Sequence, residues 1–460
     1  MLIQPARFVS VALTLVVVSA TPGFAQAQDR RPFRGIFGAP AAPDSPHSLV
    51  FTGSLFAAYD DNVVADLARN ARSRPWLQKR GTYEGAAAGL DYTFDLQGNR
   101  LAFRGHSAAQ INYFRHPDRS RALPHYLGDV SFSARLTRSL TFAARQSAAY
   151  SENYNSFLAP GGAAGVDAPG SIEDDISLPA DPALDLFELR WFRTHSTVSL
   201  AQAFGRYLSV MGAYHYRSLD VLDSELEDDA LIRFFDYGTH SGSLSIQYGR
   251  PVTRYATLNL GYAVRVSDRR SRTGEPEVMH NVNAGVNYAR ALSFSRRTTL
   301  SFGTGTAIAA NERQSTPGID PRTRAHLTGH LALAHEMGRT WTATLTYTRG
   351  LRTRDGFDGL YFTDAVRAGL DGLITRRLAF MASASWADSS IQTTVGGHHR
   401  GQSAVARLQY ALTSYLATYV QYVYHYYRFS DQVVLDPRFP RSLDRQGVRV
   451  GVTTSIPLIR

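Results

Sequence analysis

The sequence predicts an all-β protein, a transmembrane up-and-down antiparallel β-barrel of about 18 strands with short periplasmic turns and long extracellular loops. Three observations lead to this fold class. Apolar and polar residues alternate over many stretches of strand length, short turns alternate with longer polar loops, and Tyr and Trp stand where the apolar stretches end. Because successive side chains of a strand point to opposite faces, this alternation is typical of strands with one lipid-facing side.

The clearest unit is the hairpin from Val366 to Trp386. Every second residue is apolar in both of its halves, and the three-residue join Thr375–Arg377 allows only a tight antiparallel reversal. The same unit, in which a strand, a short turn, a strand and a longer loop follow one another, repeats along most of the chain.

The N-terminus is an export signal followed by a linker. Arg7 precedes the apolar run Phe8–Val18, and small residues allow cleavage after residue 25 or 27. We expect a signal peptide over residues 1–25, a periplasmic Pro/Arg-rich linker over 26–48 and the barrel over 49–460. The apolar run is too short to span a membrane comfortably, so we expect no transmembrane helix in the mature protein.

The alternating stretches follow one another from Leu49 to the C-terminus. The stretch Leu189–Ala203 is the least regular, because its apolar face changes parity midway. The predicted strands are Leu49–Tyr59, Ala86–Phe94, Leu101–Tyr113, Val130–Leu136, Leu140–Tyr150, Leu189–Ala203, Leu208–Tyr216, Gly242–Tyr248, Leu258–Val264, Val282–Tyr288, Leu300–Ile308, Leu327–Leu333, Trp341–Tyr347, Val366–Ile374, Leu378–Trp386, Ala404–Tyr410, Val420–Tyr424 and Val448–Leu458.

The connections and the aromatic residues both favour a membrane barrel. Turns of about two to six residues alternate with loops of about ten or more, an arrangement that bacterial outer-membrane barrels use and that a soluble β-sandwich or β-solenoid, the alternative, has no reason to adopt. Two aromatic girdles are expected, because Tyr and Trp favour the membrane interface. One lies beside the turns (Tyr92, Tyr248, Tyr288, Tyr410) and one beside the loops (Tyr59, Tyr113, Tyr150, Tyr216, Tyr347, Trp386).

The chain is basic, with a formal net charge of +10, and Lys79 is its only lysine. Its arginines are spread singly over the strands rather than gathered in one patch, which argues against a nucleic-acid partner. The chain has no cysteine, which excludes disulfides, a cysteine nucleophile and a lipidated cysteine. We expect no cofactor.

Seven arginines fall on the non-lipid parity of their strands, and we expect them to line the pore. An arginine on the lipid face would be costly. They would make a lumen that favours anions, or they would be neutralised by inward acids such as Asp91, Asp129 and Asp371; both hypotheses stay open. The arginines are Arg104, Arg135, Arg145, Arg265, Arg367, Arg407 and Arg449.

The segment Glu152–Asp185 is the longest interruption and the third outer loop. It is a candidate constriction loop, because its acids Glu173, Asp174, Asp175 and Asp181 would face the arginines if the loop folded inward. The alternative is a loop that stays outside.

No catalytic or metal-binding set stands out, and we do not expect an enzyme. Asp60, Asp61 and Asn62 end the first strand, where paired acids would bind Ca²⁺, activate water or simply cap the strand. His326 and His330 share a strand face but lie about 13 Å apart along it, too far for one metal ion. The sequence shows no convincing Ser/His/acid set.

The opening strand with its ending Tyr59-Asp60-Asp61-Asn62-Val63, the signal and the strand rhythm resemble the β-barrel porin type 2 group, outer-membrane barrels often associated with exopolysaccharide systems. The final Ile456–Arg460 lacks the terminal aromatic residue common in barrel assembly signals. The resemblance implies a conduit for exopolysaccharide export, acidic polymers included, in the outer membrane of a Gram-negative bacterium. A porin for small anionic solutes and a barrel enzyme acting on lipid or peptide at the outer rim are the alternatives.

The expected partners follow from this placement. They are outer-membrane lipid and lipopolysaccharide, the barrel assembly machinery and periplasmic polysaccharide-export components. The alginate exporter, also a barrel with an arginine-rich lumen, is a parallel in physics only.

Overall fold

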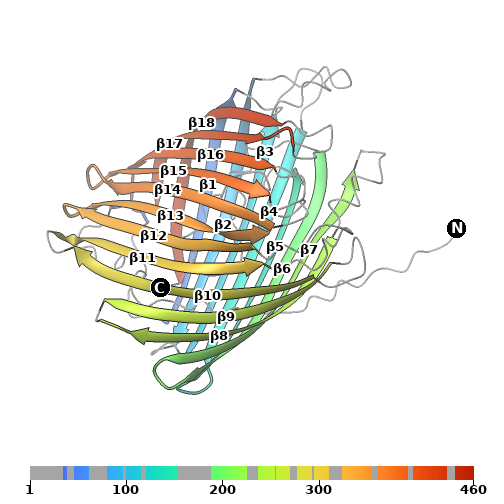
Figure 1. Cartoon of the computed structure of the whole chain (residues 1–460). Helices are drawn as coiled ribbons and strands as arrows, with labels where there is room; N and C mark the ends of the chain where they lie inside the picture. The colour runs from blue at the N-terminus through green and yellow to red at the C-terminus, as the bar shows by residue number, and fades with distance from the viewer. Residues whose placement is uncertain are drawn as a thin grey trace.

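The chain forms a closed antiparallel barrel of 18 strands, as the sequence predicts (Figure 1). The computed structural model describes residues 35–38, 46–61, 80–96, 100–114, 121–153, 188–224, 237–253, 255–269, 277–292, 295–309, 324–353, 360–391, 397–432 and 441–459. Within these ranges no helix is long and apolar enough to cross a membrane. The predicted signal peptide and most of the predicted linker lie outside the described residues.

The strands run from 13 to 18 residues in length. In chain order they are β1 (His47–Asp60), β2 (Gly81–Leu96), β3 (Leu101–Phe114), β4 (Arg121–Arg135), β5 (Leu140–Asn153), β6 (Glu188–Phe204), β7 (Leu208–Ser224), β8 (Tyr237–Pro251), β9 (Ala256–Arg269), β10 (Glu277–Leu292), β11 (Ser295–Ala309), β12 (Arg324–Met337), β13 (Trp341–Thr353), β14 (Leu360–Leu373), β15 (Leu378–Ile391), β16 (His398–Ala411), β17 (Leu416–Phe429) and β18 (Ser442–Ile459).

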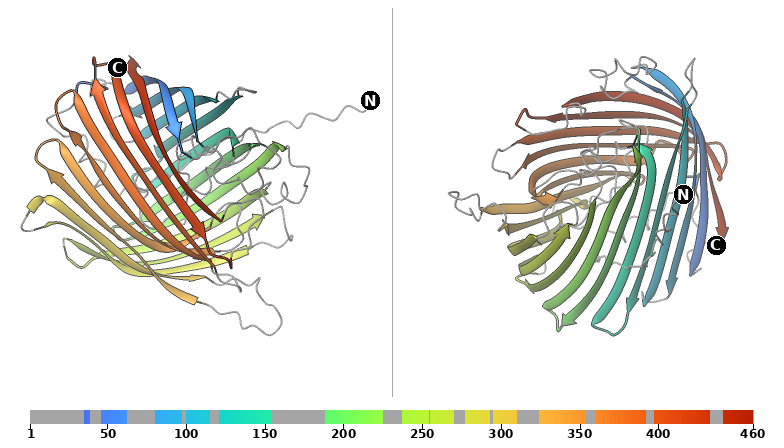
Figure 2. Two further views of the ribbon diagram at one scale, coloured as in Figure 1. Left: turned by 90° about the horizontal axis from the view of Figure 1, so that it is seen from above. Right: turned by 90° about the vertical axis from the view of Figure 1, so that its right-hand side faces the viewer.

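Every strand pairs with its neighbours in the chain, and the first strand closes the barrel against the last. The ladder between β1 and β18 runs from Leu49 opposite Ile459 to Asp60 opposite Gly447. Figure 2 shows the resulting wall from two further directions. Closure leaves no open sheet edge, which is a requirement in lipid because lipid offers no hydrogen-bond partner to the backbone.

The connections are sorted between the two ends of the barrel. At one end, which we call the short-turn end, they have two to four residues, whereas those at the other end have six or more. Three of the latter have only six residues, so the expectation of loops of about ten or more is wrong there. The strands extend beyond the residues with alternating apolar side chains. Only about 9–11 residues of each strand need to cross the membrane, and the hydrogen-bonded ladders continue past them.

Four short turns share one local structure, in which a threonine hydroxyl caps the reversal. In each turn Oγ1 of the threonine accepts hydrogen bonds from the backbone N–H groups two and three residues later, at 3.0–3.2 Å. Such hydroxyl-capped turns satisfy backbone donors that the ladder leaves open. The predicted turn Thr375–Arg377 is one of them, and the four threonines are Thr137, Thr253, Thr375 and Thr413.

The outer face carries the apolar belt that the alternation predicts. Large apolar side chains are exposed on many strands, as in Leu55 at 67% and Leu327 at 66%. A soluble protein rarely exposes so much contiguous apolar surface. Near the long-loop end, neighbouring strands place in one row Tyr347, Val366, Trp386, Gln402 and Tyr426. This row contains two members of the predicted girdle, Tyr347 and Trp386.

A row of charged residues lies just beyond that girdle and marks the upper edge of the apolar belt. It consists of Arg349, Asp364, Asp388, Arg400 and Arg428 on five adjacent strands. Arg349 and Asp364 approach to 3.6 Å, and Arg400 and Asp388 to 3.9 Å. Charged side chains are costly in lipid, so the belt ends below this row.

The irregular parity of the sixth predicted strand has a structural cause. Both ladders of β6 shift register near Trp191, against β5 and against β7. Since a shift of one residue moves side chains to the other face, an apolar pattern cannot keep one parity through it.

Part of the predicted linker contacts the short-turn end. The backbone N–H of Ile36 donates to the carbonyl of Arg376, and that of Gly38 donates to the carbonyl of Ser414, both at 3.0 Å. The acceptors Arg376 and Ser414 belong to the turns after β14 and β16, so the segment 35–38 bridges two neighbouring turns.

Candidate functional site

The predicted pore arginines lie on the face opposite the exposed apolar side chains. Arg449, for example, alternates with Val448 and Val450, which are 42% and 50% exposed. The side chain of Arg265 is outside the described part of the chain, although its backbone lies in β9. Arg104 in β3 and Arg135 in β4 are exposed on their side of the wall.

The structure brings Arg407 and Arg449 close together on the inner wall. Arg407 pairs across with Gln421, and Gln421 with Arg449, so the two arginines are two strands, or about 10 Å, apart in one row. Each guanidinium lies over an aromatic ring, Arg407 4.0 Å from the Tyr419 centroid and Arg449 4.2 Å from that of Phe56. A cation held on a ring keeps its charge, so this stretch of wall is electropositive.

Acids neutralise part of the inner wall, as the alternative hypothesis expects. Nε of Arg145 donates to Asp129 at 2.6 Å. Asp91, another proposed partner, instead contacts Nδ1 of His106 at 2.6 Å. Among the predicted pore residues, therefore, Arg145 is paired with an acid, and Asp91 is paired with a histidine.

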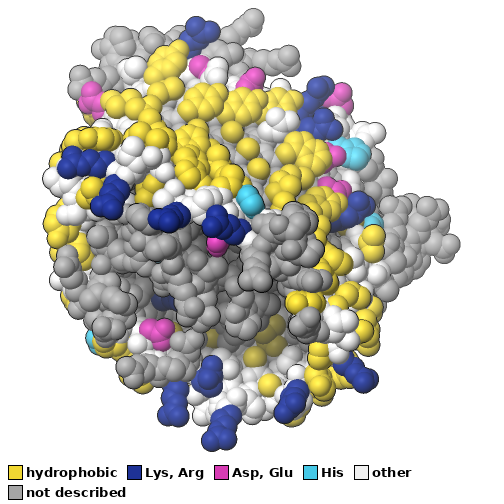
Figure 3. Space-filling model, turned by 90° about the vertical axis from the view of Figure 1, so that its left-hand side faces the viewer, with side chains coloured by type: hydrophobic (Ala, Val, Ile, Leu, Met, Phe, Trp, Pro, Cys, Tyr) yellow, Lys and Arg dark blue, Asp and Glu magenta, His cyan; other side chains and the backbone are white. Residues whose placement is uncertain are grey.

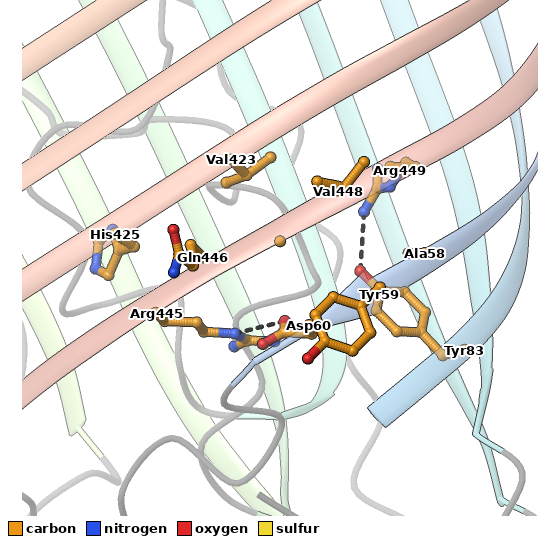
Figure 4. A pocket seen from close by; sticks show the side chains of 11 residues that line it. Ala58, Tyr59, Asp60, Tyr83, Val423, His425, Arg445, Gln446, Val448 and Arg449 are labelled. Atoms are coloured by element: carbon orange, nitrogen blue, oxygen red, sulfur yellow. Dashed lines mark hydrogen bonds and ion pairs between the residues drawn. The ribbon is translucent and has the colours of Figure 1, made fainter. Parts of the chain in front are cut away.

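A buried ion pair lies where the barrel closes. Nε of Arg445 in β18 donates to Oδ2 of Asp60 in β1 at 2.7 Å, and both side chains are less than 5% exposed. Nη2 of Arg449 donates to the hydroxyl of Tyr83 in β2 at 3.4 Å. Figure 4 shows these two contacts side by side across the seam. We call Asp60, Tyr83, Arg445 and Arg449 the seam cluster.

The seam cluster is a structural joint rather than a ligand site. The cavity beside it encloses about 20 Å³, room for no more than about one water molecule. Asp61 is also engaged by β18, because the N–H of Gln446 donates to its carboxylate at 2.8 Å. Both acids that end the first strand therefore bind the last strand, which fits the strand-capping interpretation. Within the described ranges, no group of three or more His, Asp or Glu residues could hold a metal ion.

The short-turn end carries a basic rim. Figure 3 looks at this end and shows dark-blue side chains around it. Only Asp95 and Glu336 are exposed acids among its described residues. Because the hairpins bring every second connection to the same end, arginines that are scattered singly along the sequence line one rim. The exposed arginines of this rim are Arg100, Arg135, Arg138, Arg206, Arg250, Arg297, Arg339, Arg376 and Arg377.

The long-loop end differs in charge, because four of its described arginines pair with acids. Besides the pairs Arg349–Asp364 and Arg400–Asp388, Arg441 lies 4.0 Å from Asp431, and Arg445 binds Asp60. The candidate constriction residues Glu173, Asp174, Asp175 and Asp181 lie outside the described residues. The two described ends of the barrel thus differ in charge, basic at one end and balanced at the other.

Sequence reasoning missed Arg445. The predicted final strand begins at Val448, where the apolar alternation starts, whereas β18 begins six residues earlier. One signal could have identified Arg445. Counting back from Arg449 in steps of two gives Gly447 and then Arg445, so Arg445 shares the inner face of Arg449 if the strand extends that far.

A closed barrel with an apolar outer belt and a polar inner wall has the architecture of outer-membrane channels. The chain is an 18-strand β-barrel like the outer-membrane channels of Gram-negative bacteria. No protein-family model matches it, and the search of curated proteins gives no match. The expected 18-strand barrel is therefore shown, whereas membership of the β-barrel porin type 2 group is not, because no specific family is identified.

Solved outer-membrane barrels resemble the chain at low sequence identity. The channel OccK2 (OpdF) of Pseudomonas aeruginosa, solved in complex with glucuronate, is 10% identical with a TM-score of 0.40, over 90% of this chain and 98% of that one. The FrpB iron transporter of Neisseria meningitidis is 9% identical with a TM-score of 0.41, over 90% and 81%. The siderophore receptor PirA of Pseudomonas aeruginosa is 8% identical with a TM-score of 0.38, over 89% and 80%. These likenesses do not bear on the ligand.

Proposed function

We propose that the protein is a passive outer-membrane conduit for a secreted polysaccharide, with acidic polymers preferred. The observation that carries the proposal is the difference in charge between the two ends of the barrel. Among the described residues, nine exposed arginines and two exposed acids surround the short-turn end, whereas at the long-loop end Arg349, Arg400 and Arg441 each lie within 4.0 Å of an acid. Short turns face the periplasm in outer-membrane barrels, so the basic end is the entrance for an exported chain.

The number of simultaneous contacts distinguishes a polymer from a small solute. A fixed charge acts over about 8 Å at physiological ionic strength, so one arginine attracts one passing small anion only weakly. A polyanion meets several rim arginines at once, and its many weak contacts add up. The inner wall continues the same sign of charge through Arg407 and Arg449. An acidic polymer is therefore drawn to the entrance and then stays in a favourable field.

A porin for small anionic solutes is the second candidate, and the same arginines support it. The two candidates differ in what a polymer does, because a conduit accepts a long chain whereas a selective small-solute porin excludes it. The enzyme alternative has less support, since Asp60 and Asp61 are both engaged by β18.

Three further features belong to this proposal. The first is the role of constriction loop that we expect for residues 152–185. Lipopolysaccharide contacts the charged row at the long-loop end, where Arg400 and Arg428 are exposed. Periplasmic polysaccharide-export components, after insertion by the barrel assembly machinery, deliver the polymer to the basic rim.

The test is the block of single-channel current by polymers added to one side of a planar bilayer. The probes are polygalacturonate oligomers and uncharged dextrans of the same length. The Ser414→Cys variant, labelled in a short turn by an impermeant thiol reagent, reports which way each channel inserts. We expect polygalacturonate to block at lower concentration from the short-turn side than from the long-loop side, and dextran to show no such difference. Equal block from both sides by both polymers would contradict the proposal.

A further inference from the structure

A hollow of about 290 Å³ lies on the inner wall where β18, β1, β2, β3 and β4 run side by side. Two adjacent rows of side chains form its floor. The first row, read across the five strands, is His125, Gln110, Ala87, Ser54 and Thr453. The second row is Leu127, Ala108, Gly89 and Thr52. The residues on the three middle strands, β1, β2 and β3, are mostly small, so the wall is thin there and the lumen widens.

Larger groups border this floor on both sides. In the row towards the long loops, the Phe56 ring lies across Gly85, where an added Cβ would be only 2.3 Å from the ring. In the row towards the short turns, His106 is held by Asp91. Larger side chains therefore close the hollow at both of its ends along the barrel axis.

His125 is the polar group in the hollow that the fold leaves unsatisfied. Its side chain is 8% exposed, and neither ring nitrogen has a hydrogen-bond partner within the described structure. Buried polar groups are normally paired, and each exception needs an explanation. A ligand in the hollow supplies one when the ring of His125, which lines the hollow, turns a nitrogen towards it.

The chemistry of the lining defines the ligand. Hydroxyls of Thr52 and Ser54 and two imidazoles line the hollow, and no Arg, Asp or Glu belongs to the lining. The Thr453 hydroxyl already donates to the Gly53 carbonyl and the Gln110 amide to Asn112, so the oxygens of Thr453 and Gln110 are left as acceptors. Nδ1 of His106 is 2.6 Å from the Asp91 carboxylate, so the other ring nitrogen, Nε2, can form a hydrogen bond with a ligand. The lining offers a charged ligand no arginine or carboxylate, whereas a molecule with several hydroxyls finds hydrogen-bond donors and acceptors there.

We propose that this hollow is a binding site for one uncharged, polyhydroxylated ring, the size of a single neutral sugar residue. Its volume is at the lower end of the range for small-molecule sites, roughly 300–1,000 Å³, which suits one ring rather than two. The proposal rests on the proposed function in one respect only: the conduit explains where the ring comes from, because it is a residue of the polymer in transit. Neutral rings then bind at the hollow, while acidic groups meet the arginines elsewhere.

The experiment measures sugar binding to the full-length protein in micelles of a zwitterionic detergent, because sugar-headed detergents would compete. Saturation-transfer NMR compares glucose with glucuronate, which differ only in that a carboxylate replaces the CH₂OH group. We expect saturable millimolar binding of glucose, with glucuronate weaker by about tenfold, since burying an unpaired charge is costlier than burying a hydroxyl. No saturable binding of glucose, or tighter binding of glucuronate, would overturn the proposal.

Variants assign the binding to the hollow. Ala87→Phe fills the floor, and His125→Phe keeps a ring but removes both nitrogens; each is expected to weaken glucose binding by about tenfold, the usual effect of losing a buried hydrogen bond or its space. Ala332→Phe, on the inner wall of β12 across the barrel, is the matched control and leaves binding unchanged. If both hollow variants fold, as shown by heat-modifiable migration on gels, and bind glucose like the wild type, the proposal is wrong.

The result is separable from that of the conduit proposal. A barrel that binds glucose but shows no polymer block keeps the hollow and loses the conduit. A barrel that is blocked by polymer but binds no glucose keeps the conduit and loses the hollow.

Discussion

The ion pair between Asp60 and Arg445 gives the sharpest quantitative test of how the barrel closes. The two side chains are 4% and 3% exposed, and Nε of Arg445 is 2.7 Å from the carboxylate. Asp60→Ala leaves a buried guanidinium without its counter-charge. We therefore expect the free energy of unfolding to fall by about 3–5 kcal/mol, the usual effect of breaking a buried pair from one side.

Burial decides this magnitude, and a second pair provides the control. Arg400 and Asp388 approach only to 3.9 Å and are 57% and 33% exposed. For such a pair Asp388→Ala should cost about 0–1 kcal/mol, because solvent screens the attraction. The double variant Asp60→Leu/Arg445→Met should recover most of the loss, since it leaves no uncompensated buried charge.

The assay is urea unfolding of the protein in detergent micelles, with the folded fraction read from heat-modifiable migration on gels. Asp60→Ala should unfold at clearly lower urea than both the wild type and Asp388→Ala. If Asp60→Ala and Asp388→Ala lower the free energy of unfolding equally, the Asp60–Arg445 pair is not shielded from water as the structure describes, and the expected magnitude is wrong.

Three other predictions concern the lumen, the third outer loop and the turns. Changing Arg145, Arg367 and Arg407 together to Ser should move the reversal potential towards cation selectivity, most clearly at low salt where screening is weakest; no change in a folded barrel would mean that partners neutralise them. Replacing residues 152–185 by a short Gly/Ser loop should raise single-channel conductance, and unchanged conductance would place that loop outside the pore. Thr375→Val should lower the free energy of unfolding by about 0.5–1.5 kcal/mol, because its hydroxyl accepts two backbone hydrogen bonds; an unchanged urea midpoint would show that the cap contributes nothing.

The strands could be predicted from the sequence because the bilayer imposes a simple local rule. Where a strand crosses lipid, its outward residues must be apolar, so the hairpin around Thr375–Arg377 is legible from alternation alone. Beyond the lipid the rule ends. The first residues of β18, from Ser442 to Gly447, carry no apolar alternation, and they were missed although they pair fully with β17.

The sites could not be predicted in the same way, because they depend on which strands lie opposite one another. Asp60 and Arg445 are 385 positions apart and meet only when β1 closes on β18. The hollow beside His125 requires the register of five strands at once. Local patterns assign a residue to a face of the sheet. A site also depends on strand register, which decides which residues of the neighbouring strands lie beside it.

The absence of cysteine allows a direct test of the central claim, that the arginine-bearing face lines water and the opposite face lies in lipid. Single cysteines are introduced at neighbouring positions on two sides of the barrel, Gln421 and Val420 in β17, and Ala332 and Leu331 in β12. In lipid vesicles, a water-soluble thiol reagent should label Gln421→Cys and Ala332→Cys rapidly and leave Val420→Cys and Leu331→Cys unmodified. Equal labelling of neighbours, or faster labelling of Val420→Cys and Leu331→Cys, would contradict the account.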